Sequence, residues 1–192
     1  ARTSVPISTI TSGGWTLCWS GNYGGNDLLT NLQNSCTGKY LLYAGGVKDA
    51  TSYTLIGAGE RDSVFKTTAN NVTTSNNGLF WYYNPSKSMG FADTSVITQS
   101  SADTTNMSST SRLSWHTGHC GAGKICGGWR VGSTLWLNSS TTYVRAIYQS
   151  SGSASSSDEG WSAWSSATVS PSSLVTSGTN NTLTISNITN DK

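Results

Sequence analysis

Charged side chains are scarce in this chain of 192 residues. Lys and Arg number 11, Asp and Glu number 9, and together they form 10% of the sequence, against about 25% in an average soluble domain. Surface polarity must therefore come from Ser, Thr, Asn and Gly, which favour turns and strands over helices. The net charge of +2, with no basic cluster, offers little electrostatic attraction to nucleic acid, so we expect no nucleic-acid partner.

Long apolar runs are missing as well. No run approaches the roughly 18 residues that a membrane-spanning helix needs, so we expect no membrane span. The beginning, ARTSVPISTI, has no apolar signal-peptide core, and we interpret the chain as a mature protein or as part of a longer precursor.

Catalytic and calcium-binding motifs are also absent. Neither the nucleophile elbow G-x-S-x-G nor a D-x-D-x-D-G loop occurs. The acidic residues are scattered, with only Asp158 and Glu159 adjacent, and in GERD (residues 59–62) an arginine separates two acids, which we interpret as a turn with a local ion pair. None of the many serines stands out as a nucleophile. The sequence therefore predicts a non-enzymatic protein with no cofactor.

Two histidines and two cysteines lie within one short stretch, SWHTGHCGAGKICGGWRVG: His116, His119, Cys120 and Cys126. Their chemistry suits zinc, but adjacent residues of an extended chain point in opposite directions, which separates His119 from Cys120. The alternative is a disulfide between Cys120 and Cys126, because the glycines of the intervening loop let a small ring close. Cys18 would then pair with Cys36. Four cysteines allow three pairings, and we favour this one, with no metal site.

Five Asn-X-Ser/Thr sequons accompany the cysteines, each in a stretch rich in Ser and Thr: Asn71, Asn106, Asn138, Asn180 and Asn187. Such sequons receive N-linked glycans in exposed segments of secreted proteins. Disulfides persist in the same oxidising compartments. We therefore predict a secreted, extracellular or cell-surface glycoprotein with two disulfide bonds and N-glycosylation at these asparagines.

Composition divides the chain into four parts: residues 1–13, an extended N-terminal arm; 14–149, a disulfide-stapled β-rich core; 150–157, a Ser-rich linker; and 158–192, a C-terminal strand-forming segment. The apolar residues of the arm are Val5, Ile7 and Ile10. The C-terminal segment has strand-like runs but no cysteine, and about 35 residues are too few to bury a core of their own. It must dock on the core, on a neighbouring module or on another copy.

Strand patterns recur throughout the core. They cover residues 39–46, 52–59, 62–68, 79–84, 94–100, 133–140 and 141–150. In the last run, one alternating set consists of Tyr143, Arg145 and Ile147, and the other of Val144, Ala146 and Tyr148. One short helix is expected in NDLLTNLQN behind a capping Asn26 or Asp27, with leucines at helical spacing at Leu28, Leu29 and Leu32. The predicted fold is mainly β (a β-rich α+β class): a disulfide-stapled sheet domain with one short helix and extended terminal strands.

Aromatic residues are plentiful, with eight Trp and eight Tyr. Six tryptophans are expected to build the core: Trp15, Trp19, Trp81, Trp115, Trp129 and Trp136. In LFWYYN, however, three aromatic residues are consecutive, so at least one of them should face outward from a strand. An exposed ring can stack on the apolar face of a sugar while an amide binds the hydroxyls. The candidates for sugar contact, against packing in the core, are Trp81, Tyr82, Tyr83 and Asn84.

The segment GGWTLCWS (residues 13–20) is similar to the GGGWTL opening of fibrinogen C-terminal-like and intelectin-like secreted domains. RLSWHT (112–117) and GGWRVGSTLWLNSSTTYVRAIYQS (127–150) resemble the closing segments of divergent extracellular modules with this opening. The resemblance covers about residues 13–150 and implies a disulfide-bonded, β-rich domain for binding or assembly outside cells. The W-x-x-Y-x-x-G-F-G block and the acidic calcium loop are missing, so only structural roles for Trp15, Trp115 and Trp129 are carried over.

The C-terminal segment has two short resemblances of its own. Trp161-Ser-Ala-Trp164 has the W-x-x-W spacing of thrombospondin type 1 repeats, where such tryptophans can carry C-linked mannose, although the cysteines that follow in that family are missing. NTLTISNITND resembles the late strands of an immunoglobulin-like domain, without the Tyr-x-Cys that would continue them. Trp161 and Trp164 are therefore candidates for C-mannosylation in a segment that can complete another sheet.

These observations predict a structural protein that acts in self-assembly or cell adhesion, as a subunit or repeat of a surface coat, adhesin or filament. Unpaired strands leave backbone groups unsatisfied, so the terminal arms would add strands to copies of the chain or to adjacent modules of a longer chain. The alternative for the arms is that both fold back onto their own core. The second functional hypothesis is a carbohydrate-binding lectin domain that uses the exposed aromatics at residues 81–84 or the loop between Cys120 and Cys126.

Overall fold

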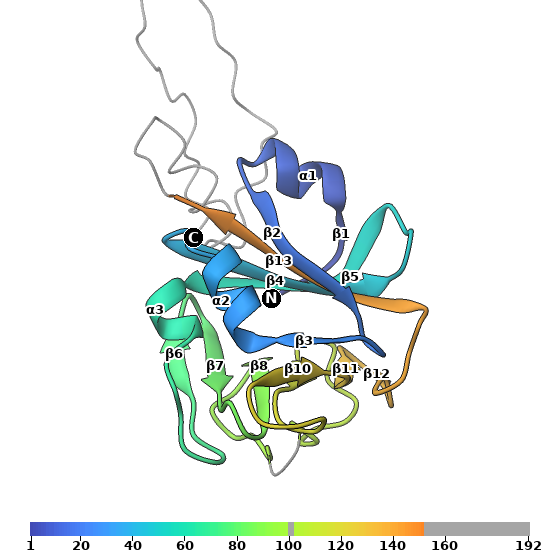
Figure 1. The fold of residues 1–192 in the computed structure, drawn as a ribbon. Coiled ribbons are helices and arrows are strands. Elements are labelled where there is room, and N and C mark those ends of the chain that lie inside the picture. The colour runs from blue at the N-terminus through green and yellow to red at the C-terminus, as the bar shows by residue number, and fades with distance from the viewer. Residues whose placement is uncertain (100–101, 152–192) are drawn as a thin grey trace, which may run out of the picture.

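The computed structural model describes residues 1–99 and 102–151 (Figure 1). It is 45% strand and 11% helix and contains two disulfides, which confirms the predicted β-rich, disulfide-stapled class. In chain order the elements are β1 (Arg2–Pro6), α1 (Ile7–Ser12), β2 (Thr16–Asn22), β3 (Asn26–Leu28), α2 (Leu29–Ser35), β4 (Tyr40–Val47), β5 (Ser52–Glu60), α3 (Arg61–Val64), β6 (Thr74–Asn76), β7 (Leu79–Tyr83), β8 (Ser88–Ala92), β9 (Leu113–His116), β10 (Lys124–Cys126), β11 (Gly128–Val131), β12 (Thr134–Leu135) and β13 (Tyr143–Ser150).

A five-stranded sheet joins the two ends of the described chain. Its strands are antiparallel in the order β1-β5-β4-β13-β2, so the last strand lies between two early ones. The alternation expected in TTYVRAIYQS is confirmed, because Ile147 belongs to the core on one face and Ala146 and Tyr148 to a second cluster on the other. Both faces of this sheet are therefore buried.

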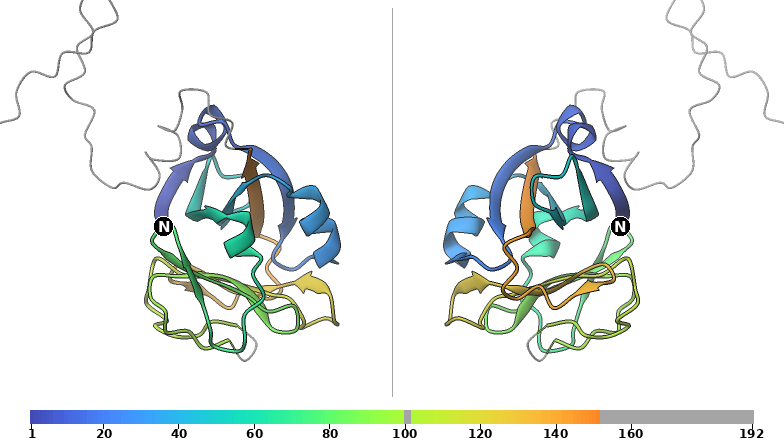
Figure 2. Two further views of the ribbon diagram at one scale, coloured as in Figure 1. Left: turned by 90° about the vertical axis from the view of Figure 1, so that its left-hand side faces the viewer. Right: turned by 90° about the vertical axis from the view of Figure 1, so that its right-hand side faces the viewer.

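A six-stranded antiparallel sheet lies beneath the first one in both views of Figure 2, in the order β12-β11-β9-β8-β7-β6. The hairpin between β6 and β7 turns at Asn77 and Gly78, which have φ of 51° and 68°. Two left-handed residues in a two-residue loop match the twist of the flanking strands. The short strands β3 and β10 form a separate antiparallel pair.

The main core fills the space between the two large sheets. Trp81 and Phe91 of the six-stranded sheet reach the backbone of β5 at Gly57 and Gly59. A Cβ added to Gly57 would lie 2.8 Å from the Phe91 ring, and one on Gly59 would lie 2.9 Å from the Trp81 ring. The glycines of β5 therefore give the large rings the room that any other residue would take away.

The N-terminal arm folds onto its own chain, which corrects the expected extended conformation of residues 1–13. Arg2–Pro6 pairs with β5, and Ile7–Ser12 forms α1. α1 lies against the five-stranded sheet (Figures 1 and 2). Its Ile10 is fully buried in a cluster with Ala146 and Tyr148, on the face opposite the main core. The reason is that Ile7 and Ile10 are three residues apart, which places them on one side of a helix but on opposite sides of an extended strand.

Several short elements also differ from the patterns. Residues 62–68 contain the end of α3 and no strand, residues 94–99 form no strand, and 133–140 contain only the two-residue β12. The helix expected near residue 28 is α2, but it has no side-chain cap, and Leu28 ends β3 with 46% of its surface exposed. Three helices occur among the described residues instead of the expected one. None of them is long and apolar enough to cross a membrane.

Candidate functional site

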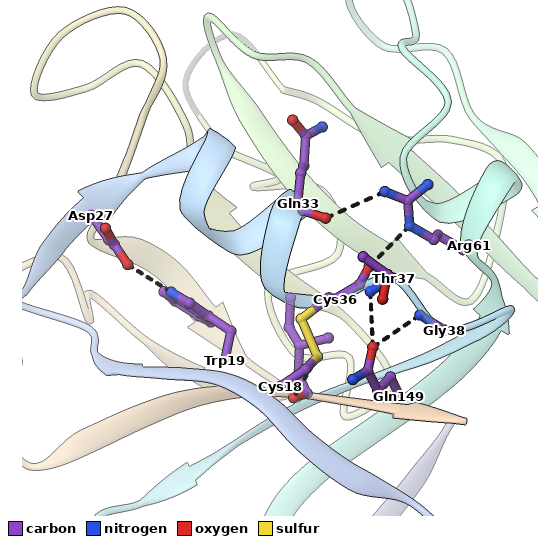
Figure 3. The surroundings of a disulfide bond; sticks show 10 residues. Cys18, Trp19, Asp27, Gln33, Cys36, Thr37, Gly38, Arg61 and Gln149 are labelled. Carbon is purple, nitrogen blue, oxygen red and sulfur yellow. Dashed lines mark hydrogen bonds between the residues drawn. A yellow bond between two sulfur atoms is a disulfide. The ribbon is translucent and has the colours of Figure 1, made fainter. Parts of the chain in front are cut away.

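The disulfide between Cys18 and Cys36 ties β2 to the end of α2 (Figure 3). Arg61 supports the same end of α2 by donating to two backbone carbonyls, from Nε to Cys36 at 2.9 Å and from a terminal nitrogen to Gln33 at 3.3 Å. This arginine therefore donates hydrogen bonds to carbonyl groups that have no donor within the helix at its C-terminal end. Neither Glu60 nor Asp62 forms an ion pair with Arg61, so the local pair expected in GERD does not form.

The surroundings of this disulfide hold further structural contacts (Figure 3). The Trp19 indole donates to Asp27 at 2.9 Å, and this hydrogen bond is the main reason that the pKa of Asp27 lies below its usual value. Gln149 Oε1 accepts the backbone N–H groups of Thr37 and Gly38 at 2.8 and 2.9 Å. Trp19, Asp27 and Gln149 therefore make structural contacts around this disulfide.

The second disulfide joins Cys120 and Cys126, so both disulfides have the pairing expected from the sequence. Thiolate ligands for zinc are therefore not available in this loop. Within the described ranges, no group of three or more His, Cys, Asp or Glu side chains is placed to hold a metal ion. His116 and His119 stack with ring centroids 5.2 Å apart, but they face no carboxylate cluster.

His116 instead positions an asparagine side chain. It is 3% exposed at the end of β9, and its Nε2 lies 2.7 Å from Oδ1 of Asn138. An imidazole N–H that donates to this oxygen leaves the amide nitrogen of Asn138 on the other side. Asn138 is half-buried and belongs to one of the predicted sequons.

Trp136 lies two residues before this asparagine and was expected in the core, which the structure corrects. It is 71% exposed, with a left-handed φ of 65°. Its ring centroid is 4.0 Å from that of half-buried Trp129 of β11 in an edge-to-face arrangement. Trp136 directly follows β12, a two-residue strand at the edge of the six-stranded sheet, so its side chain is not part of the sheet. It is the most exposed large apolar residue among those the structure describes.

The expected sugar-contact residues are not available to a ligand. Trp81, Tyr82 and Tyr83 are only 0%, 1% and 5% exposed, and Asn84 donates from its amide to the backbone carbonyl of Thr68. β7 has two covered faces, because the main core takes Trp81 and Tyr83 while Tyr82 packs on the other side against residues of the β8 end and the following loop. Consecutive aromatic residues therefore reflect a strand buried on both sides.

The described parts of the loop that covers this outer face, residues 93–99 and 102–112, are held by a buried arginine. Arg112 is 1% exposed and forms ion pairs with Asp103 at 2.7 Å and Asp93 at 2.9 Å. Burial opposes ionisation of Asp93, but hydrogen bonds from Ser109 and Arg112 and the charge of the arginine outweigh it, so the pKa of Asp93 lies below its usual value. Sequence patterns did not reveal this loop, because its order depends on charged contacts and not on apolar periodicity.

Arg130 of β11 forms no ion pair with a carboxylate of the described residues, and it contacts the same loop through the loop's backbone carbonyl groups. It is fully buried and donates to five carbonyl oxygens at 2.8–3.0 Å, those of Thr105, Asn106, Met107, Ser109 and Gly132. Burial lowers the pKa of Arg130, but five acceptors surround the guanidinium. The segment that carries the Asn106 sequon is therefore wrapped around one side chain.

Replacing this guanidinium should destabilise the protein strongly. We expect Arg130→Met to lower the free energy of unfolding by about 3–5 kcal/mol, because it leaves several buried carbonyl groups without donors. The matched control is Arg61→Met, which removes only two such contacts from a half-buried site and should cost about 1 kcal/mol. Urea unfolding of both variants measures the difference, and equal losses would contradict the role of the five-carbonyl cage.

The predicted modification sites fall into three groups. Asn71 and Asn106 are exposed, with φ of 63° and 45° in turns. Asn138 is half-buried beside His116. The remaining sites lie outside the described residues: Asn180, Asn187, Trp161 and Trp164. Only Asn71 and Asn106 are therefore exposed among the three described sites, and glycan occupancy at all five asparagines stays a prediction.

β2 forms one edge of the five-stranded sheet. It is seven residues long, contains no proline and no charged residue, and exposes 48% of Leu17. An open hollow of about 450 Å³ lies at its beginning, between Thr16, residues 37–39 and residues 149–151, where β13 ends. The last described strand, β13, therefore ends beside this edge.

Comparison with protein-family models, with curated proteins and with solved structures found no match to this chain. The resemblance to fibrinogen-like and intelectin-like domains accordingly stays a prediction. Two surface features of the described residues bear on function: the open edge of β2, and the exposed Trp136 two residues before Asn138.

Proposed function

We propose that this chain is a non-enzymatic extracellular glycoprotein module for self-assembly or adhesion, in which the C-terminal segment of one copy adds a strand to the β2 edge of another. The observation that carries the proposal is an edge strand of seven uncharged residues without proline, with an exposed apolar side chain. Such an edge is a template for a further strand.

The other sheet edges are less suited to this role. β1 contains Pro6 and a left-handed Ser4 with φ of 54°, and both features interrupt regular pairing. β6 and β12, the two edges of the six-stranded sheet, have only three and two residues, and the paired strands β3 and β10 have three each. Among the described strands, β2 is therefore the best acceptor.

The backbone hydrogen bonds between β2 and β13 show which backbone N–H and C=O groups of β2 face outward. The backbone N–H of Tyr23 donates to the carbonyl oxygen of Tyr143. In an antiparallel pair, every second residue of a strand is hydrogen-bonded to the partner strand, so Trp19 is also hydrogen-bonded to β13. Ser20 therefore directs its backbone groups away from β13. A register shift between Trp19 and Leu17 turns Leu17 outward as well. The open part of the edge runs through Leu17 and Ser20, both exposed.

The proposed donor is NTLTISN, residues 181–187, in the C-terminal segment. Leu183 and Ile185 alternate with small polar residues there, which is the pattern of a strand with one apolar face. The segment has no charged residue that would oppose pairing with uncharged β2. The N-terminal strand is already paired with β5 of its own chain, so the C-terminal segment is the proposed donor.

A charge placed on the acceptor edge should weaken the association. We expect Leu17→Lys to reduce self-association at least about tenfold, or about 1.4 kcal/mol, because lysine on an edge must be desolvated when a strand is added. Val47→Lys is the matched control, since Val47 is also a strand residue and is 45% exposed, but at the end of β4.

Analytical ultracentrifugation over a concentration series measures this effect in the full chain. Residues 1–151 alone should remain monomeric, because they keep the acceptor and lack the donor. If the full chain and residues 1–151 are equally monomeric at high concentration, assembly by strand addition is rejected. Equal weakening by the two lysine variants would reject β2 as the acceptor while leaving assembly itself in place.

A carbohydrate-binding lectin is the second proposal, and the observation that favours it is the exposed ring of Trp136. The proposed surface moves there from residues 81–84, which are buried or engaged with the backbone. An exposed indole has the apolar face that a pyranose ring requires. The same ring lies two residues from a sequon, so a free ligand and the chain's own glycan would compete for it.

A further inference from the structure

Trp136 occupies a backbone conformation that its own side chain disfavours. Left-handed φ is rare for a bulky residue and costs roughly 1–2 kcal/mol, yet Trp136 has φ of 65° and keeps 71% of its surface exposed. The strain is therefore not compensated by burial of this ring. Trp129 contacts it edge to face with centroids 4.0 Å apart, which supports the indole and leaves its outer surface open. Strain of this kind points to a functional contact.

Asn138 lies two residues after this tryptophan and is oriented by a buried partner. Its Oδ1 lies 2.7 Å from Nε2 of His116, and His116 is only 3% exposed. Among the described residues, the amide nitrogen Nδ2 has no hydrogen-bond partner. The imidazole thus holds the oxygen inward and leaves the atom that receives a glycan on the outer side.

We propose that Asn138 carries an N-linked glycan whose first N-acetylglucosamine packs on the indole of Trp136 in the same chain. In the modification, Nδ2 attacks the anomeric carbon of an oligosaccharide linked to a lipid diphosphate. The new C–N bond forms, the C–O bond to the diphosphate breaks, and Nδ2 loses one proton as the lipid diphosphate leaves. Oδ1 is unchanged, so it still accepts from His116 after folding.

The chemistry of both partners favours this contact. One face of a pyranose ring presents C–H groups, and the face of an indole is the negative part of its quadrupole, so the two attract and exclude water. Trp129 and His116 act as positioning residues, the first for the platform and the second for the amide. The proposal requires that the chain enters the secretory route but does not require self-assembly.

Neighbouring sequons provide an internal comparison. The residue two positions before Asn71 is Ala69, and the residue two positions before Asn106 is Thr104. Among the sequons that the structure describes, Asn138 alone has an aromatic residue at this position. Glycans at Asn71 and Asn106 should therefore gain nothing from Trp136.

The test is a two-by-two comparison in the full chain with Asn138 as the sole sequon, made by Asn→Gln at the other four. The chain is secreted from a eukaryotic host, or made without N-glycosylation in a bacterial periplasm, each with Trp136 or with Trp136→Asn. Asparagine tolerates left-handed φ, so this variant removes the ring without adding strain. We expect the glycan to raise the Tm by about 2–4 °C with Trp136 and to leave it unchanged in Trp136→Asn.

Two further readouts make the result decisive. An endoglycosidase that leaves the first N-acetylglucosamine should preserve the Tm increase, and the acetyl and ring protons of that sugar should shift upfield only when Trp136 is present. A chain with Asn106 as the sole sequon should show no dependence on Trp136. An unoccupied Asn138, equal Tm shifts with and without the ring, or Trp136-dependent binding of free oligosaccharides by the glycosylated protein would each overturn the proposal. Sedimentation tests self-assembly separately, so the two failures are distinguishable.

Discussion

Raising the pH above 10 should unfold the described domain in one steep transition. Tyr23, Tyr43 and Tyr82 are at most 1% exposed, and burial raises the pKa of each phenol well above its ordinary value of 10. The folded protein keeps these groups protonated, whereas the unfolded chain ionises them above pH 10. Stability from this source is therefore complete below pH 10 and is lost as the pH rises.

Arg145 opposes this trend. Burial lowers its pKa from 12.5 to about 10, so above pH 10 the folded state releases a proton that the unfolded chain still binds, and this group stabilises the fold as the pH rises. Three tyrosines outweigh one arginine, and the net slope is on the order of 3 kcal/mol per pH unit. A domain of ordinary stability, about 5–15 kcal/mol, should then unfold within a few pH units.

Tyrosinate absorbance and circular dichroism, followed together, measure this transition. Both signals should change at the same pH if the buried phenols ionise only on unfolding. Tyr43→Phe is a matched variant, because the Tyr43 hydroxyl has no hydrogen-bond partner in the described part of the chain. It should make the pH slope shallower without loss of stability at neutral pH. Ionisation of all tyrosines well before the loss of ellipticity would contradict the assignment.

Gly90→Ala should be the most damaging single methyl group in the described domain. Gly90 lies in β8 between β7 and β9, and an added Cβ would lie 2.0 Å from the Leu113 carbonyl oxygen and 2.8 Å from the Tyr82 hydroxyl. Those two groups are themselves hydrogen-bonded at 2.8 Å. The methyl group would separate β8 from β9 and break this contact, so we expect a loss of more than about 4 kcal/mol or a failure to fold.

Gly78→Ala is the control that separates crowding from backbone strain. Gly78 has φ of 68° in the β6–β7 turn, but an added Cβ would meet nothing within 4 Å. Strain alone should cost this variant roughly 1–2 kcal/mol. Secreted yield and urea unfolding compare the two alanines, and similar stabilities would show that β8 and β9 can move apart more easily than the geometry indicates.

Local patterns were sufficient where neighbouring residues decide the outcome. The alternation in TTYVRAIYQS correctly predicted that Ile147 lies on the opposite face of β13 from Ala146 and Tyr148. The glycines between Cys120 and Cys126 correctly indicated a small disulfide loop. The spacing of Trp136 and Asn138 was also visible as W-x-N-x-S. Trp136 was expected in the core because of the size of its ring, so this spacing carried no prediction.

Burial of the aromatic strand was beyond local patterns. Period-two alternation predicts one outward ring among Trp81, Tyr82 and Tyr83, but a distant loop covers that side of β7. The loop is ordered by Arg112 and Arg130, whose partners are carboxylates and backbone carbonyls scattered between residues 93 and 132. Polar contacts of this kind leave no period in the sequence.

By itself the sequence indicated the β-rich class, favoured the observed disulfide pairing among three, and assigned the side chains of β13 to two opposite faces, because each depends on residues close together in the chain. The tertiary structure alone decided which aromatic rings stay in water and which sheet edge stays open. Those outcomes depend on what distant segments cover: α1 folds onto the five-stranded sheet and the loop after β8 onto the six-stranded one. Trp136 remains exposed because its strand ends at the sheet edge.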